Sequence, residues 1–344
     1  MGWFGINYSK PGKGVDPNAP EKNAFFTFFE LYGRRFVRLM GVNILYFLCI
    51  FPLFSYGYAL LFSQLSQLTG GERIMTPLLD LSLTLIQGLM SLHPALYWVL
   101  FAASALAYGP LTAGLTYICR NFSRREHAWV SDLFGKAKSN WKQGLFFGLF
   151  DILSVFVLLT NWDLRAVLPA LFDSAPILFD VIRIITVILF IAYFMMRYYI
   201  YQLMVTYDLK IREIFQNSLI FLMMGIIRNL FVTVILLVSA VVFLFISPVI
   251  ELVALPLVAF SFWGFFVAYT TFPFIDRTIR AARTASGGDA EPLPEPDWDA
   301  EEEDDGSIVY PWDKFNRDDL TEPEDTPEFP EGESGYDEDD SSEE

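Results

Sequence analysis

Long apolar runs alternate with short polar stretches between residues 23 and 275 of this 344-residue chain. A run of about 20 apolar residues predicts a membrane-spanning helix, because that length crosses the hydrocarbon core of a bilayer. We therefore expect an all-α, polytopic membrane helix bundle of six spans. The spans are predicted at 39–62, 95–118, 144–161, 181–205, 229–246 and 250–273.

Basic amphipathic segments precede three of these spans. Residues 22–40 place aromatic side chains on one helical face and arginines on the other, which is typical of an interfacial helix. Similar segments start near Asp132 and Asp208, before the third and fifth spans. The pattern suggests three helical hairpins, each entered through a basic interfacial helix.

Residues 74–92 form an amphipathic segment with a weakly charged polar face. Its apolar stripe is Leu78, Leu81, Leu85, Leu89 and Leu92, and its polar stripe is Asp80, Thr84, Gln87 and Ser91. If this segment spanned, the basic loop at Arg120 would face outward, against the tendency of basic loops to stay inside. We expect the segment to lie on the outer surface.

The net charge of −16 hides two unlike regions. Residues 285–344 hold 25 acidic and 2 basic residues, a charge of −23, which leaves +7 on residues 1–284. The positions of the basic residues predict a multi-pass protein of the cell membrane with both termini in the cytoplasm. We expect a flexible N-terminal segment (1–22), a transmembrane domain (23–283) and a disordered acidic cytoplasmic tail (284–344).

Several motifs flank the junction between the second and third spans. They are Gly109-Pro-x-Thr-Ala-Gly114, Arg120-Asn-Phe-x-Arg-x-Glu-His127, Ser131-Asp132 and Lys138-Ser-Asn-Trp-Lys-Gln143. Two further segments belong to the pattern, Asn43-Ile-Leu-Tyr-Phe-Leu-Cys-Ile-Phe-Pro52 and Tyr207-Asp-Leu-Lys-Ile-Arg-Glu-Ile-Phe-Gln-Asn217. Together these motifs resemble the YesL-like family of bacterial membrane proteins over roughly residues 23–275.

The resemblance implies an association and no reaction. The family has no assigned activity, and its members look like companions of carbohydrate uptake systems. This chain departs from the family pattern by about fifty residues between Pro52 and Gly109, and its acidic tail looks like an addition.

Two charged residues fall inside predicted spans, Asp151 in the third and Arg197 in the fourth. A carboxylate at mid-depth costs ~2.5–3.5 kcal/mol unless it is paired or protonated. The two residues lie at similar distances from the inner side, so a structural ion pair is the favoured interpretation. A transport role for the pair is the alternative.

A basic interfacial face is predicted between the second and third spans, where it would attract anionic lipid headgroups. Its members are Arg120, Arg124, Arg125, Lys136, Lys138 and Lys142. His127 is interpreted as a polar interfacial residue, because the only other histidine, His93, is expected on the opposite membrane face. No catalytic, cofactor-binding or metal-binding motif is present, and no nucleic-acid partner is expected.

Gly109 and Pro110 predict a break in the second span. The break serves either close helix packing, which we favour, or exposure of backbone to a substrate. The expected function is an accessory or scaffold protein without enzymatic activity, with the lipid bilayer and membrane transporter subunits as partners. The alternative is a transporter with a path near Asp151, Arg197 and Gly109-Pro110. A scaffold predicts a dry, packed bundle, and a transporter predicts a polar cavity.

Overall fold

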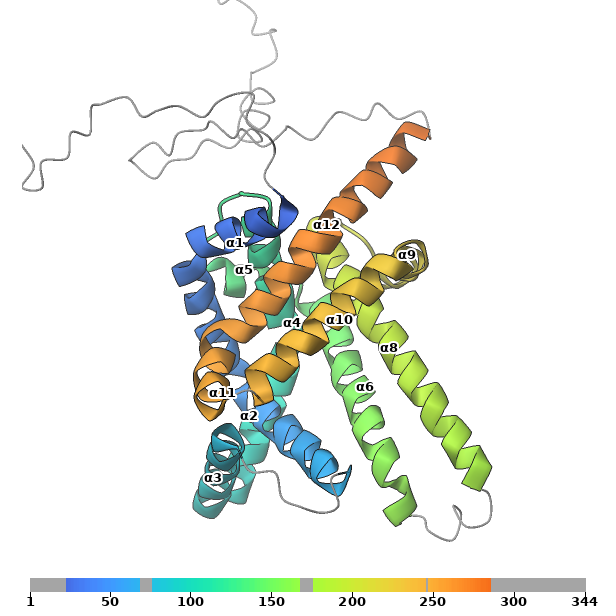
Figure 1. Cartoon of the computed structure of the whole chain (residues 1–344). Helices are drawn as coiled ribbons and strands as arrows, with labels where there is room; N and C mark the ends of the chain where they lie inside the picture. The colour runs from blue at the N-terminus through green and yellow to red at the C-terminus, as the bar shows by residue number, and fades with distance from the viewer. Residues whose placement is uncertain (1–22, 69–75, 168–175, 246, 286–344) are drawn as a thin grey trace, which may run out of the picture. The chain divides into compact units, whose positions relative to one another are not determined.

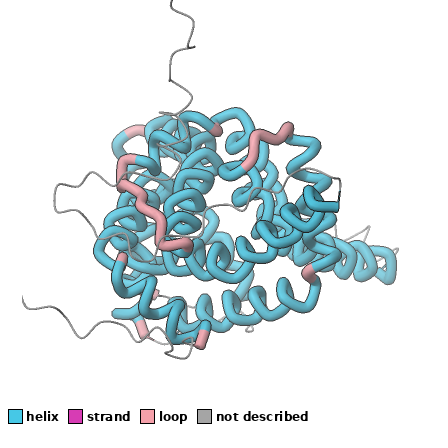
Figure 2. The backbone as a smooth tube through the Cα atoms, turned by 90° about the horizontal axis from the view of Figure 1, so that it is seen from above, coloured by secondary structure: helices cyan, strands magenta, loops and turns pink. Residues whose placement is uncertain are grey.

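The computed structural model describes residues 23–68, 76–167, 176–245 and 247–285, and every regular element within these ranges is a helix (Figures 1 and 2). The expectations for the N-terminal segment 1–22 and for the acidic tail fall outside the described residues. The elements are α1 (Ala24–Arg34), α2 (Phe36–Leu68), α3 (Pro77–Leu92), α4 (Pro94–Ser123), α5 (Asp132–Ser139), α6 (Trp141–Val167), α8 (Pro176–Thr206), α9 (Ile211–Met224), α10 (Ile226–Phe245), α11 (Pro248–Ala254), the π-helical turn η1 (Leu255–Ala259) and α12 (Phe260–Ala285).

Six helical segments in the described part of the chain are long and apolar enough to cross a membrane. They are Phe36–Ser66, Ala95–Ser123, Trp141–Asn161, Ile177–Thr206, Ile226–Leu244 and Val249–Ala282. The expected all-α, six-span class is therefore confirmed, and the chain is a multi-pass membrane protein. The short helices α1, α5 and α9 precede the spans α2, α6 and α10, as the hairpin pattern predicted.

Helix α4 lies at the centre of the described bundle and packs against α2, α5, α6, α8 and α12. Glycines make its closest contacts possible. A Cβ atom on Gly109 would lie 1.9 Å from the carbonyl oxygen of Gly144, and one on Gly148 would lie 2.5 Å from the Cα of Gly109. A Cβ on Gly114 would lie 2.2 Å from the carbonyl oxygen of Leu133 in α5. The α4 and α6 backbones therefore touch, which only glycine permits.

The predicted helix break at Gly109 and Pro110 is wrong. Helix α4 continues without interruption from Pro94 to Ser123, with Pro110 inside it. Pro110 lacks only one N–H donor, and tight packing by neighbouring helices lets membrane helices tolerate proline. The favoured half of that prediction, close packing at these residues, is what the structure shows.

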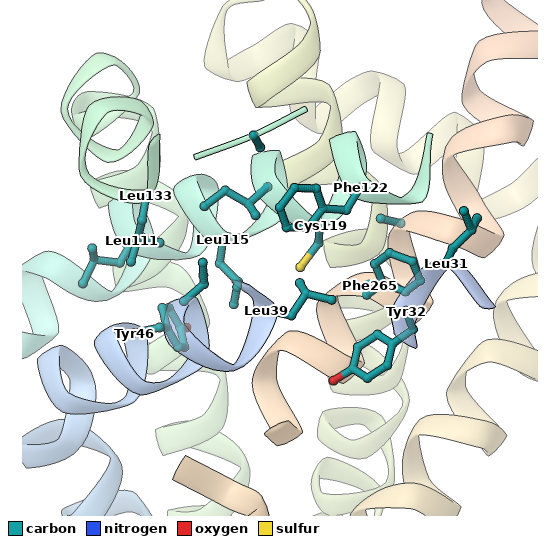
Figure 3. Packing of buried hydrophobic residues seen from close by; sticks show 14 of the residues in the cluster. Leu31, Tyr32, Leu39, Tyr46, Leu111, Leu115, Cys119, Phe122, Leu133 and Phe265 are labelled. Atoms are coloured by element: carbon teal, nitrogen blue, oxygen red, sulfur yellow. The ribbon is translucent and has the colours of Figure 1, made fainter. Parts of the chain in front are cut away.

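Buried apolar side chains from α1, α2, α4, α5 and α12 form one core cluster (Figure 3). Leu39, Ile118, Cys119, Leu133 and Phe265 are fully buried in it. Cys119 is a free thiol packed among these side chains, where it acts as a small apolar residue. A second cluster forms around the C-terminal half of α8 and joins it to α9, α10 and α12.

Helix α3 packs against α2, α4 and α11, but through a different face from the one predicted. It buries Leu78, Leu79 and Ser82, whereas Leu81 and Leu85 of the predicted stripe are exposed. Leu78 is common to both faces, so the buried face is rotated from the predicted one by less than one residue, or less than about 100°. Its neighbours α2 and α11, which the sequence pattern does not show, determine this rotation.

The C-terminal part of α6 and the N-terminal part of α8 extend away from the rest of the bundle (Figure 1). Ile184, Ile188 and Leu189 of α8 and Leu153 and Phe156 of α6 are at least half exposed. In a multi-pass membrane protein such apolar exposure corresponds to contact with lipid tails. The C-terminal half of α8 is by contrast buried, so this helix changes from lipid-facing to core-forming along its length.

The turn η1 is a π-helical segment that joins α11 to α12, and a buried asparagine of α2 satisfies its backbone. Asn43 donates through Nδ2 to the carbonyl oxygens of Leu255 (3.0 Å) and Pro256 (2.6 Å). Its Oδ1 accepts the N–H of Ser261 at 2.7 Å. Asn43 therefore supplies bonds that the widened turn cannot make within itself.

Candidate functional site

The structure brings Asp151 and Arg197 together, as the sequence predicted. Nε of Arg197 donates to Oδ2 of Asp151 at 2.8 Å. The Asp151 side chain is only 5% exposed, and that of Arg197 is 26% exposed. A buried carboxylate without its cation would be costly in the apolar interior of a membrane protein, so the geometry supports a stabilising ion pair.

Three tyrosines complete this cluster. Tyr193 donates its O–H to Oδ1 of Asp151 at 2.5 Å, and Tyr201 donates to Oδ2 at 2.7 Å. Nη2 of Arg197 donates to the phenolic oxygen of Tyr108 at 2.9 Å. The guanidinium also lies over the ring of Tyr201, 5.1 Å from its centroid. Both oxygens of Asp151 therefore have protein donors.

The network continues from α4 into α2 through hydroxyl groups. Thr112 donates to the backbone carbonyl of Tyr108 at 2.7 Å, and its Oγ1 lies 2.9 Å from the hydroxyl of Tyr46. Helices α2, α4, α6 and α8 are thus joined by one chain of polar contacts at the level of Asp151. This arrangement can hold these four helices together.

The C-terminal half of α8 carries further polar contacts that sequence reasoning missed. Tyr198 pairs with Thr233 of α10 at 2.9 Å, and Tyr199 donates to Asn229 of α10 at 2.5 Å. Gln202 donates to Thr271 of α12 at 2.5 Å. These tyrosines were counted as apolar members of a span. Several tyrosines occur close together between Tyr193 and Gln202. This pattern indicates polar contacts between helices, since a buried tyrosine hydroxyl usually has a hydrogen-bond partner.

Arg120 does not belong to the predicted basic face. It is 8% exposed and donates to Oδ1 of Asn121 (3.1 and 2.7 Å), to Oγ1 of Thr206 (2.7 Å) and to the carbonyl of Val205 (3.3 Å). The guanidinium therefore binds the last turn of α8, where unpaired carbonyl groups accept hydrogen bonds. Its function here is to join α4 to α8, and the inclusion of Arg120 in a surface patch was wrong.

The other predicted basic residues lie at or near the surface. Arg124 pairs with Glu126 at 3.0 Å, and Lys136 lies over the ring of Tyr117. Arg125, Lys138 and Lys142 are exposed. The predicted basic face is thus reduced in the structure to these exposed residues and two partly covered neighbours.

Large aromatic side chains lie close in sequence to these exposed charges, and the ammonium group of Lys142 lies over the ring of Trp141. Trp129, Phe134 and Trp141 are 59%, 48% and 53% exposed. Aromatic residues next to Lys and Arg at the end of a span are typical of the membrane interface. We call the set Arg125, Trp129, Phe134, Lys138, Trp141 and Lys142 the basic–aromatic face.

Arg125 holds a left-handed backbone conformation, with φ of 64°. It follows the C-terminus of α4, where the N–H of Arg125 bonds to the carbonyl of Phe122 and that of Glu126 to the carbonyl of Asn121. Glycine is the residue that usually occupies this capping position, because it has no Cβ. An exposed arginine there is locally unfavourable, and it adds positive charge to the basic–aromatic face.

His127 lies beside Arg38 of α2, with Nε2 3.0 Å from Nη1 of the arginine. Its ring also meets that of Trp129 edge-on, with centroids 4.7 Å apart. These contacts agree with the interpretation of His127 as an interfacial residue. No group of three or more metal-binding side chains occurs among the described residues.

Comparison with protein-family models, curated proteins and solved structures gives no match. The geometry of the chain itself therefore carries the functional interpretation. The sites described so far are an ion-paired polar cluster within the bundle and a basic–aromatic face at one end of the spans.

A groove between α10 and α12 does not resemble a path for a polar solute. Ser239 is the polar residue of its lining, and it accepts the indole N–H of Trp263 at 3.0 Å. The lining residues are Val234, Ile235, Val238, Ser239, Val242, Phe243 and Phe262.

Proposed function

We propose that this protein is an accessory or scaffold protein of a bacterial cell membrane, without enzymatic activity. In this proposal the six-span bundle is a rigid support, and the basic–aromatic face binds anionic lipid headgroups and a partner membrane complex. The proposal also takes both termini to be cytoplasmic. The resemblance to the YesL-like family makes subunits of a carbohydrate uptake system the proposed partner.

The observation that carries the proposal is the bonding of Asp151. Its two oxygens accept hydrogen bonds from Tyr193, Arg197 and Tyr201, all of which are protein groups. A carboxylate whose two oxygens both accept from protein groups is less available to a transported solute or ion than a free one. The contact between the backbones of α4 and α6 also favours a fixed arrangement over one that rocks or opens.

The basic–aromatic face supports the binding part of the proposal. Each basic residue close to an anionic membrane surface contributes about 1 kcal/mol of attraction. Trp129 and Trp141 provide amphipathic rings that favour the headgroup region. The alternative function, a transporter with a path near Asp151, Arg197 and Gly109-Pro110, is not favoured, because α4 is continuous at Gly109.

Quantitative affinity purification from native membranes tests the proposal. We expect transporter subunits to be enriched with the wild-type chain and to be depleted severalfold with the double variant Lys138→Glu/Lys142→Glu. The double variant Lys210→Glu/Arg212→Glu is the matched control, because it changes the same charge at two other exposed residues. Equal enrichment by both variants would refute a role for the basic–aromatic face. Solute uptake by the purified chain alone in liposomes would refute the scaffold function.

A further inference from the structure

A second acidic residue lies within a membrane span, and no cationic partner for it occurs among the residues that the structure describes. Glu251 of α11 is 0% exposed. Its Oε1 accepts hydrogen bonds from the hydroxyl of Tyr58 and from Oγ1 of Thr76, the latter at 2.6 Å. Its Oε2 is buried, and no group of the described residues forms a hydrogen bond with it. Glu251 forms no ion pair in the described part of the chain, in contrast to Asp151.

The surroundings of Glu251 are apolar. Tyr58 belongs to a buried cluster with Phe62, Leu78 and Leu255, which come from α2, α3 and η1. The charged and titratable groups of the neighbouring helices are few. Tyr58 of α2 bonds to Glu251 directly, Asp80 of α3 is exposed, and Arg228 of α10 stands at the opposite end of that helix.

We propose that Glu251 is a proton-binding site, occupied in the folded protein so that its side chain is a neutral carboxylic acid. An ionised carboxylate here would be a buried charge with no counterion in the described helices around it, an arrangement that membrane proteins avoid. A proton on Oε2 removes that charge and leaves only one hydrogen bond unmade, which is the smaller cost. Oε1 then acts as the carbonyl oxygen that accepts from Tyr58 and Thr76.

The site also links proton binding to helix α3. Thr76 is the N-terminal cap of α3, where its Oγ1 accepts the N–H of Leu79 at 3.2 Å while its O–H is donated to Glu251. Thr76 is partly exposed, so it offers a route for a proton between Glu251 and the surface. Loss of the proton would leave a charge at the contact between α3 and α11, and we expect the first turn of α3 to loosen.

Infrared spectroscopy of the full chain in lipid nanodiscs tests the proposal directly. At neutral pH we expect the carbonyl stretch of a protonated carboxyl group in the wild type, with a downshift in heavy water, and its loss in Glu251→Gln. Asp151→Asn is the matched control, because Asp151 is ion-paired and its replacement should leave that band unchanged. Absence of the band from the wild type at neutral pH would overturn the proposal. So would a band that disappears in Asp151→Asn.

Amide hydrogen exchange provides a second test, which compares the wild-type protein at two pH values. The folded state binds a proton that the unfolded state releases at neutral pH, so stability should fall as pH rises. Amides of residues 76–82 should exchange several times faster at alkaline pH than at neutral pH in the wild type, after correction for intrinsic rates. Glu251→Gln, which cannot ionise, should show no such increase. An equal increase in both proteins, or a requirement for sodium ions to protect α3 in the wild type, would contradict a bound proton.

Discussion

The contribution of the Asp151–Arg197 ion pair to the free energy of unfolding can be measured by replacing each residue alone and then both together. Asp151→Leu leaves Arg197 without its carboxylate and removes the acceptor of two tyrosine hydroxyls. Breaking a buried pair costs about 3–5 kcal/mol. The side chain of Arg197 is 26% exposed, which favours the lower end, about 3 kcal/mol. Asp151→Lys should cost more, because it places two cations together.

The double variant separates an ion pair from two independent contributions. Arg197→Leu alone should also cost about 3 kcal/mol, because it leaves Asp151 with only neutral donors. We expect Asp151→Leu/Arg197→Leu to cost about 3–4 kcal/mol instead of about 6, a coupling of about 2–3 kcal/mol, since no unpaired charge remains. Equilibrium unfolding in mixed detergent micelles, followed by tryptophan fluorescence, provides the free energies.

A control on the same helix makes the result interpretable. Tyr198→Phe removes the contact with Thr233 and does not touch the Asp151 cluster. Combined with Asp151→Leu, it should give additive losses within about 0.5 kcal/mol. If the losses of Asp151→Leu and Arg197→Leu were also additive, the ion pair would contribute nothing, and the central argument for a structural role would be refuted.

Three further predictions concern packing, a helix terminus and topology. Gly109→Ala should destabilise the bundle by about 1–3 kcal/mol or prevent folding, because its Cβ would collide with α6. The control Gly135→Ala, with no atom within 4 Å of its Cβ, should be neutral or stabilising. Equal losses of stability in the two variants would contradict the contact between α4 and α6. Arg125→Gly should raise the free energy of unfolding by up to about 1 kcal/mol, because glycine adopts the left-handed backbone conformation without strain. The same variant should bind anionic vesicles more weakly, because it removes a positive charge. A loss of stability would show that the backbone of Arg125 is not strained. In a cysteine-free background, a cysteine at Ser66 should react with an impermeant thiol reagent from outside and one at Ser139 only from inside, and the reverse pattern would invert the proposed orientation.

The sequence predicted the spans well because their signal is local. Length and hydropathy define a span without knowledge of any other residue, so the six predicted positions overlap the helices observed. The pairing of Asp151 with Arg197 followed from depth, since each is a charged residue in an otherwise apolar span. The exact partners were less accessible, because tyrosine is both apolar and polar, and the three hydroxyls around the pair depend on which faces meet.

The errors share a physical cause, which is that burial of a polar residue depends on tertiary contacts. Arg120 was assigned to a surface because it begins a basic stretch, but the end of α8 lies beside it and accepts its hydrogen bonds. Glu251 falls at the start of the predicted span 250–273, where a charged residue normally faces water, so the sequence does not indicate that it is buried. Its burial follows from α3, which packs against α11.

The π-helical turn between Leu255 and Ala259 has a consequence for chain length. A π-turn contains one residue more than an α-turn, and one residue of α-helix corresponds to a rotation of about 100°. Deletion of a single residue from this turn would therefore rotate all of α12 relative to α11. Phe265, Ala268 and Ile275, which are fully buried, would then turn away from α4 and α8. One extra residue, held by Asn43, thus selects which side of the last span becomes interior.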